Sequence, residues 1–234
     1  MISFTELHKQ IQESLGLKIY ERLMQLETMQ HIFSMNFSVL NNFFSFMKDE
    51  KKVLELWRVG NRTKITIFHR EYVRHIFNFL SSAKAYIDTT REIIKANYTG
   101  EMLKQSYDAK VSEVFAQSEL CGFIQDFRNY HTHFEIPLSH SQLHLSSVPE
   151  EEPFSFKIYV EKQKLYEWSG WKSRAREYLA KASDKIDFEN VCVEYFNLVN
   201  GFYDWLYNEI ATFHQKELEE YSSLIEQMNM RFQQ

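Results

Sequence analysis

Proline and glycine, the residues that most often interrupt helices, are scarce in this chain. Its 234 residues include 3 prolines and 6 glycines, and no proline occurs before Pro137. Helices in the first half therefore meet almost no residue that would end or kink them. We expect the first half to be nearly all α-helical.

Cysteine is equally scarce. The two cysteines, Cys121 and Cys192, are flanked by apolar residues, which favours buried free thiols in a reducing compartment over a disulfide or a zinc site. The N-terminus lacks the basic-then-apolar order of a secretion signal, and no stretch is apolar for long enough to span a bilayer. We expect a soluble, cytoplasmic protein without membrane contact.

Positive charge is not in excess either. The formal net charge of −5 at pH 7 argues against a broad, nonspecific nucleic-acid binder, although a local basic cleft remains compatible with it. The chain has no Gly-rich phosphate loop, no dinucleotide fingerprint and no nucleophile elbow. Hydrophobic residues make up 44% of the chain and aromatic residues 16%, and the aromatics recur at the spacing of packed helices.

The apolar spacing predicts an all-α fold, a bundle of long antiparallel helices in a single domain over residues 1–234. We expect a core over 18–138, completed by a C-terminal helix over 187–228. Within it the pattern predicts helices over 3–14, ended by Gly16, then over 18–46, 68–97, 101–115 and from about Ser118 onward. Residues 53–68 are ambiguous, because Gly60-Asn61 separates two β-branched or aromatic runs, as it would in a hairpin or loop.

An insertion is expected over residues 139–180, where the composition changes. Residues 142–145 and 154–160 alternate as strands do, and Pro149–Pro153 lies between them. This pattern predicts a small β-hairpin around residues 141–162.

The most informative segment is 127–133, between a helical run and Pro137. Arg128, Asn129, Tyr130, His131 and His133 bring a fixed cation, an amide, a phenol and two imidazoles together. On a regular helix Asn129 and His133 share a face, whereas Arg128 and His133 diverge by about 140°. Arg128 and His133 can therefore meet only if the last turn unwinds before Pro137 or if a second copy completes the site.

The segment contains Arg128 and Asn129, followed after three residues by His133. This pattern resembles the active-site motif of the HEPN superfamily. The similarity extends more loosely from Phe68 to Leu138, through a helix that carries residues 82–91, an intervening helix and the motif itself. It implies a HEPN-like helical bundle that acts as a metal-independent endoribonuclease without a cofactor. It also implies a homodimer, RNA as the substrate, an antitoxin or regulatory protein as a further partner, and a role in a toxin–antitoxin system or in phage defence.

The resemblance also implies roles for the motif residues. Arg128 would grip the scissile phosphate, His133 would activate the ribose 2′-hydroxyl or protonate the leaving oxygen, and Asn129 would orient His133 or hold a phosphate oxygen. Supporting positions would be Asp88, Arg91, Tyr130 and His131. The alternative is a catalytically silent HEPN-like module used for dimerisation or for ligand or nucleotide binding.

Each of these residues also has a structural interpretation. Arg128 could pair with Asp126 or with a C-terminal carboxylate, and His133 could interact with the helix dipole. Tyr130 suits packing, His131 suits a supporting or an exposed position, and Asp88 and Arg91 suit a simple salt bridge.

Two further sites are weaker. His131, His133, His140 and His144 cluster in one stretch, but no cysteine or close carboxylate pair completes a metal site there. The densest basic region is a solvated face or a contact for the RNA backbone. It comprises Lys157, Lys162, Lys164, Lys172, Arg174 and Arg176, interleaved with Tyr159, Tyr166, Trp168 and Trp171.

Overall fold

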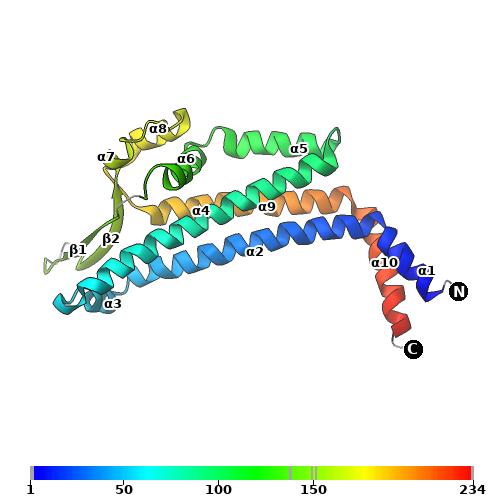
Figure 1. Cartoon of the computed structure of the whole chain (residues 1–234), viewed down its shortest axis with the longest axis horizontal. Coiled ribbons are helices and arrows are strands. Elements are labelled where there is room, and N and C mark those ends of the chain that lie inside the picture. The colour runs from blue at the N-terminus through cyan, green and yellow to red at the C-terminus, as the bar shows by residue number, and fades with distance from the viewer. Residues whose placement is uncertain (1–2, 137–138, 149, 151, 233–234) are drawn as a thin grey trace. The chain divides into compact units, whose positions relative to one another are not determined.

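Helices make up most of the protein, as the scarcity of proline and glycine predicts. The structure is a computed structural model that describes residues 3–136, 139–148, 150 and 152–232. Its elements in chain order are α1 (Phe4–Glu13), α2 (Leu15–Met47), α3 (Glu50–Leu56), the 3₁₀ turn η1 (Val59–Asn61), α4 (Arg62–Tyr98), α5 (Met102–Val111), the π-helical segment η2 (Ser112–Ala116), α6 (Glu119–His133), β1 (His140–Leu145), β2 (Phe154–Glu161), α7 (Lys162–Leu165), α8 (Ser173–Lys181), β3 (Lys185–Ile186), α9 (Phe188–Phe213) and α10 (Gln215–Phe232) (Figure 1). The mostly helical expectation is confirmed.

The chain divides into two compact units. The first comprises residues 1–31, 86–110 and 200–234, and the second comprises residues 32–85 and 111–199. Helices α2, α4 and α9 each contribute residues to both units. The expectation of one domain over the whole chain stays a prediction.

Long antiparallel helices form the aromatic core of the second unit. Phe33 of α2 stacks on Phe79 of α4 with 5.2 Å between the ring centroids, and Phe43 stacks on Phe68 at 4.3 Å. Because residue numbers rise along one helix as they fall along the other, α2 and α4 run antiparallel. Helix α9 joins the same core, where Phe196 stacks on Phe37 of α2 at 3.8 Å.

The first unit holds a small core between the terminal helices. Leu7 and Ile11 of α1 are buried together with Met228 of α10. The helix break that we expected at Gly16 is wrong, because Gly16 lies inside α2 and only Ser14 separates α1 from α2. A Cβ atom at Gly16 would lie 2.3 Å from the carbonyl oxygen of Glu217, so glycine here permits the close approach of α10.

Residues 53–68 are helical rather than a hairpin or a strand. Asp49 caps α3 by accepting the backbone N–H of Lys52 at 3.1 Å, and Gly60 lies in η1. Val53 and Leu56 are buried three residues apart, which places both on one helical face. Burial of that face outweighs the β propensity of the local sequence, and α4 begins at Arg62, earlier than expected.

The C-terminal helix expected over 187–228 is divided in two. His214 separates α9 from α10, and Figure 1 shows α10 at an angle to the end of α9. His214 is itself buried, and its ring lies 5.6 Å from that of Tyr98. The apolar stripe continues from α9 into α10, so the helical periodicity of the sequence did not reveal the bend at His214.

The predicted β-hairpin is confirmed. β1 and β2 pair antiparallel, with Gln142 opposite Lys157. A third short strand, β3, which the sequence did not reveal, pairs antiparallel with β2. Phe156, Ile158 and Val160 of β2 are buried, so alternate residues of this strand face away from the core. Residues 149 and 151 of the expected hairpin tip, and Pro137 beyond the motif, lie outside the described residues.

The remaining sequence expectations concern membranes and thiols. Among the residues that the structure describes, no helix has the length and apolar character needed to cross a membrane. Both cysteines are free; Cys192 is buried and Cys121 is half-buried. Burial raises the pKa of both thiols, which makes them poor nucleophiles.

Candidate functional site

Helix α6 carries the Arg-Asn-x₃-His segment and is regular to its last residue. Ser118 caps it by accepting the backbone N–H of Cys121 at 3.2 Å. At the other end, the N–H of Phe134 donates to the carbonyl oxygen of Tyr130 at 2.9 Å, a helical i to i−4 bond. The last turn is therefore not unwound up to His133.

One face of α6 is packed into an aromatic cluster of the second unit. Phe123 stacks on Tyr178 at 4.5 Å, Phe127 stacks on Phe188 at 4.5 Å, and Tyr130 stacks on Trp171 at 5.7 Å between centroids. Trp171 is fixed by its indole N–H, which donates to the carbonyl oxygen of Leu165 at 2.6 Å. Figure 1 shows α8 beside α6 in this arrangement.

Tyr130 belongs to this cluster, so the packing interpretation of this residue is the one the structure supports. Its side chain is 1% exposed. Burial, followed by the charges of Glu135 and Glu167, raises the pKa of Tyr130 to about 12. The phenol is therefore neutral at physiological pH.

His131 is buried as well, and the interpretation of an exposed His131 is wrong. Its ring lies 4.4 Å from the ring of Phe127, and its Nε2 atom has no hydrogen-bond partner among the described residues. Burial lowers the pKa of His131 to about 4. This imidazole is neutral near pH 7, and its place in the core assigns it to packing.

The opposite face of α6 is a polar stripe that consists of Gln125, Arg128, Asn129, Thr132 and His133. Gln125, Thr132 and His133 are exposed, whereas Arg128 and Asn129 are half-buried. At 100° per residue, Arg128 and His133 lie at the two edges of this stripe and Asn129 lies between them. The structure therefore places the three candidate catalytic residues on the polar stripe, with Arg128 and His133 diverging at its edges.

Arg128 has no carboxylate partner in the part of the chain that the structure describes. Its guanidinium Nη1 donates to Oδ1 of Asn129 at 3.4 Å, at the outer limit of a hydrogen bond. The alternative pairing with Asp126 is wrong, because Asp126 is 2% exposed and accepts the backbone N–H of Lys172 at 2.7 Å. Arg128 is thus free to bind an anion.

The supporting pair Asp88 and Arg91 lies in the first unit, whereas α6 lies in the second. Nη1 of Arg91 is 3.9 Å from Oδ1 of Asp88, and the two side chains are 58% and 50% exposed. The salt-bridge interpretation of this pair is therefore confirmed. An exposed pair of this kind contributes ~0–1 kcal/mol to stability.

The four histidines considered for a metal site occupy different environments. His131 is buried and His133 is exposed, while His140 stacks on Tyr159 at 5.8 Å. Among the described residues, no three His, Cys, Asp or Glu side chains gather as metal ligands would.

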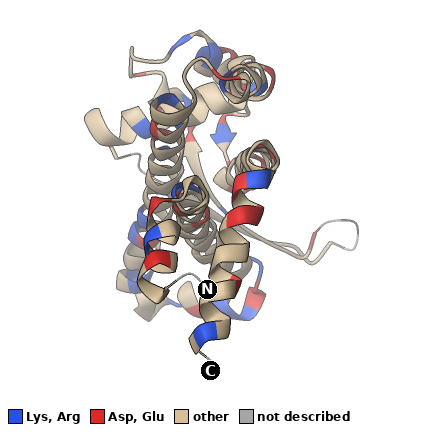
Figure 2. Ribbon diagram, turned by 90° about the vertical axis from the view of Figure 1, so that its right-hand side faces the viewer, with Lys and Arg blue, Asp and Glu red and all other residues tan. Residues whose placement is uncertain are grey.

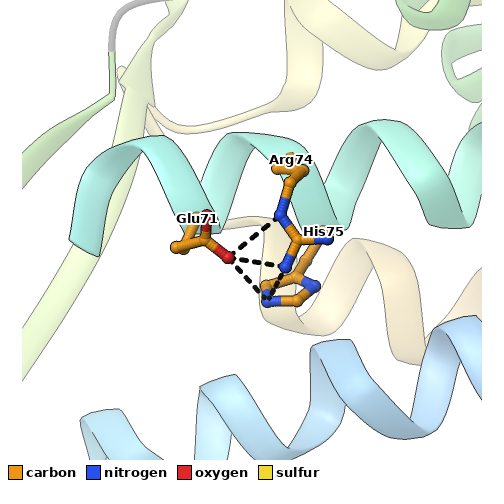
Figure 3. A network of polar contacts seen from close by, with 3 residues as sticks. All are labelled: Glu71, Arg74 and His75. Carbon is orange, nitrogen blue, oxygen red and sulfur yellow. Dashed lines mark hydrogen bonds and ion pairs between the residues drawn. The ribbon is translucent and has the colours of Figure 1, made fainter. Parts of the chain in front are cut away.

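A second cluster on α4 combines a guanidinium with an imidazole. Figure 3 shows Glu71, Arg74 and His75 converging on the surface of the helix. Nε of Arg74 donates to Oε2 of Glu71 at 2.9 Å, and Nε2 of His75 lies 3.7 Å from the same oxygen. Burial and the charge of Arg74 lower the pKa of His75, against the opposing effect of Glu71. The i, i+3, i+4 spacing of Glu71, Arg74 and His75 could have indicated this cluster from the sequence. The guanidinium of Arg74, however, is already paired with the carboxylate of Glu71.

His69 forms a third polar contact that no local pattern could have revealed. Its Nδ1 atom lies 2.8 Å from Oγ of Ser139, and its Nε2 atom lies 3.0 Å from Oγ of Ser141. The two serines are about seventy positions away in the chain. The contact joins α4 to the start of the hairpin.

Comparison with known proteins gives no match to a family model, to a curated protein or to a solved structure. The resemblance to the HEPN superfamily therefore stays a prediction that rests on Arg128, Asn129 and His133.

Proposed function

We propose that the protein is a HEPN-like, metal-independent endoribonuclease whose active site is built from the polar stripe of α6. The observation that carries the proposal is the state of Arg128. It is half-buried, has no carboxylate partner within the described ranges, and lies on the polar stripe of α6 that also holds Asn129 and His133. An unpaired guanidinium beside an amide and an imidazole is suited to a phosphodiester, because it binds phosphate oxygens through fixed donors. The biological setting we propose is that of a toxin or a phage-defence effector.

The proposed reaction is an internal transesterification. The ribose 2′-oxygen attacks the phosphorus and forms a new P–O bond, while the bond from phosphorus to the 5′-oxygen of the next nucleotide breaks. The products are a 2′,3′-cyclic phosphate and a free 5′-hydroxyl. His133 accepts the 2′-hydroxyl proton or donates one to the leaving oxygen, and Arg128 stabilises the additional negative charge on the phosphate. Asn129 holds a phosphate oxygen or orients His133.

We further propose that two copies form the site together. Because α6 remains helical through His133, Arg128 and His133 of one helix point about 140° apart. Placing the same stripe of a second copy opposite the first would bring Arg128 of one chain towards His133 of the other. A two-fold axis makes this arrangement reciprocal and produces two equivalent sites.

The proposal is tested by RNA cleavage in the presence of a chelator. Purified protein is incubated with a structured RNA, an unstructured RNA and an RNA with 2′-deoxy substitution at each nucleotide. We expect cleavage of the ribose-containing RNAs and none of the 2′-deoxy strand. Arg128→Ala and His133→Ala should each reduce the rate by about 10²–10⁴-fold, the range for removing a charge-stabilising donor or a general acid–base group.

Gln125→Ala is the matched control, since Gln125 is exposed on the same stripe and has no role in the proposed chemistry. It should retain the rate of the unsubstituted protein. Cleavage that persists in both Arg128→Ala and His133→Ala, or that requires a metal ion, would contradict the proposal. Dimerisation or ligand binding with no cleavage of any RNA would favour the catalytically silent module instead.

A further inference from the structure

The outer face of the small sheet forms a groove in the second unit, separate from the polar stripe of α6. The groove has a volume of about 630 Å³, and Gln142, Ser155, Lys157, Tyr159, Lys185 and Asn190 are among its lining residues. They come from all three strands and from the first turn of α9. Most of them are exposed, so the groove opens to solvent rather than enclosing a ligand.

The strand register explains why this face is polar. Phe156, Ile158 and Val160 are buried, so the pleat turns Ser155, Lys157 and Tyr159 outward. Gln142 of β1 lies opposite Lys157. The sheet therefore presents a lysine, an amide, a hydroxyl and an aromatic ring side by side.

Two lysines of this groove are not neutralised by carboxylates. Lys157 is exposed, and its side chain has no ion pair or hydrogen bond among the described residues. Nζ of Lys185 lies 4.6 Å from the ring centroid of Tyr159 and donates to Oε1 of Gln142 at 2.8 Å. In the part of the chain that the structure describes, Lys185 has no carboxylate partner.

Most other cations of the basic region behave differently. Lys162 pairs with Asp184, Lys164 with Glu167, and Arg174 with Glu177. Three of the six cations in the region that the sequence marked as basic are therefore paired with carboxylates. Lys157 belongs to that region, whereas the sequence did not group Lys185 with it, and these two are the lysines that line the groove.

Two carboxylates, Glu152 and Asp187, also line the groove, and within the described residues neither forms an ion pair with Lys157 or Lys185. Asp187 is engaged at the start of α9, where its Oδ1 accepts the backbone N–H of Glu189 at 2.9 Å. Glu152 lies just before β2, whereas Lys157 lies within the strand. The part of the groove around Lys157 and Lys185 thus favours an anion.

We propose that this groove binds the phosphate backbone of a single RNA strand, with Lys157 and Lys185 each contacting a phosphate. The inference rests on the proposed function, which makes RNA the substrate. The open form of the groove suits a strand that continues beyond both ends. Gln142, Ser155 and Asn190 supply hydrogen-bonding groups for bases or sugars.

The test measures binding without cleavage. Fluorescence anisotropy follows a labelled, single-stranded RNA of twelve nucleotides that is 2′-O-methylated throughout, so no 2′-hydroxyl is available as a nucleophile. The Lys157→Gln/Lys185→Gln protein should bind about tenfold or more weakly. Loss of two phosphate contacts should also reduce the slope of log K against log salt by about 1.4.

A matched double variant, Lys164→Gln/Lys172→Gln, removes the same charge from exposed positions outside the groove. It should bind within about twofold of the unsubstituted protein, and circular dichroism should show that both double variants are folded. Equal weakening by the two doubles, or no weakening by the groove double, overturns the proposal. Because this RNA cannot be cleaved, the assay reports binding to the groove alone. A protein without nuclease activity can still bind through the groove, and a nuclease can lack groove binding, so the two proposals are tested separately.

Discussion

At the scale of the residue, neighbouring positions in the motif have opposite roles. Tyr130 and His131 are buried in an aromatic cluster, while Arg128, Asn129 and His133 face outward. The difference follows from 100° steps around α6. The motif predicted Arg128, Asn129 and His133 as candidates, and the packing of α6 against Trp171 and Phe188 showed which of their neighbours belong to the core.

The buried His131 predicts a dependence of stability on pH. Its pKa is about 4 in the folded chain, against ~6.5 when unfolded. Between these values only the unfolded state binds the proton, so this contribution to stability is complete above pH ~6.5 and declines as the pH falls towards 4. His131→Phe keeps a ring in the core and removes the proton site.

The measurement is the free energy of unfolding in urea at pH 7 and at pH 5. The loss between these two values should be about 2 kcal/mol smaller for His131→Phe than for the unsubstituted protein. An identical loss in both proteins would show that His131 does not titrate as its burial implies.

At the scale of the element, the position of α6 depends on its close contact with α8. A Cβ atom at Gly122 would lie 2.5 Å from Cβ of Arg174. Asp126, one turn further along, accepts the N–H of Lys172, which directly precedes α8. Glycine and a buried carboxylate thus fix the helix that carries the polar stripe.

Gly122→Ala should therefore destabilise the fold. Overpacking of roughly 1–3 kcal/mol exceeds the gain in helix propensity, and we expect a net loss of about 1–2 kcal/mol in the free energy of unfolding. Gly201→Ala is the matched control within a helix, since nothing lies within 4 Å of its Cβ position. Gly201→Ala should raise the free energy of unfolding by about 0.5–1 kcal/mol. If urea denaturation shows that both variants change the free energy of unfolding in the same direction, the proposed close contact at Gly122 is wrong.

At the scale of the whole molecule, charges of both signs are interspersed along the ribbon (Figure 2). The net charge of −5 is therefore compatible with RNA only through restricted sites such as the polar stripe and the sheet groove.

The composite site makes a prediction about mixed subunits. Arg128→Ala and His133→Ala chains, each inactive alone, are co-expressed so that heterodimers form. In a heterodimer one site lacks both residues and the other retains both, so the mixture should recover about a quarter of the unsubstituted activity, for two-fold symmetric pairing. RNA cleavage by the mixture is the readout, and an inactive mixture that contains heterodimers would mean that the site is not shared between copies.

The sequence by itself determined the mostly helical fold, the hairpin near residues 141–162 and the divergence of Arg128 from His133 on a regular helix. These features follow from local periodicity and from the scarcity of proline and glycine. Tertiary structure decided the rest. Glycine at position 16 permits the close approach of α10, residues 53–68 are helical because their apolar face is buried, and His131 is neutral because it is buried. Lys157 and Lys185 lie in one groove because β3 pairs with β2, and pairing between distant segments leaves no local pattern in the sequence.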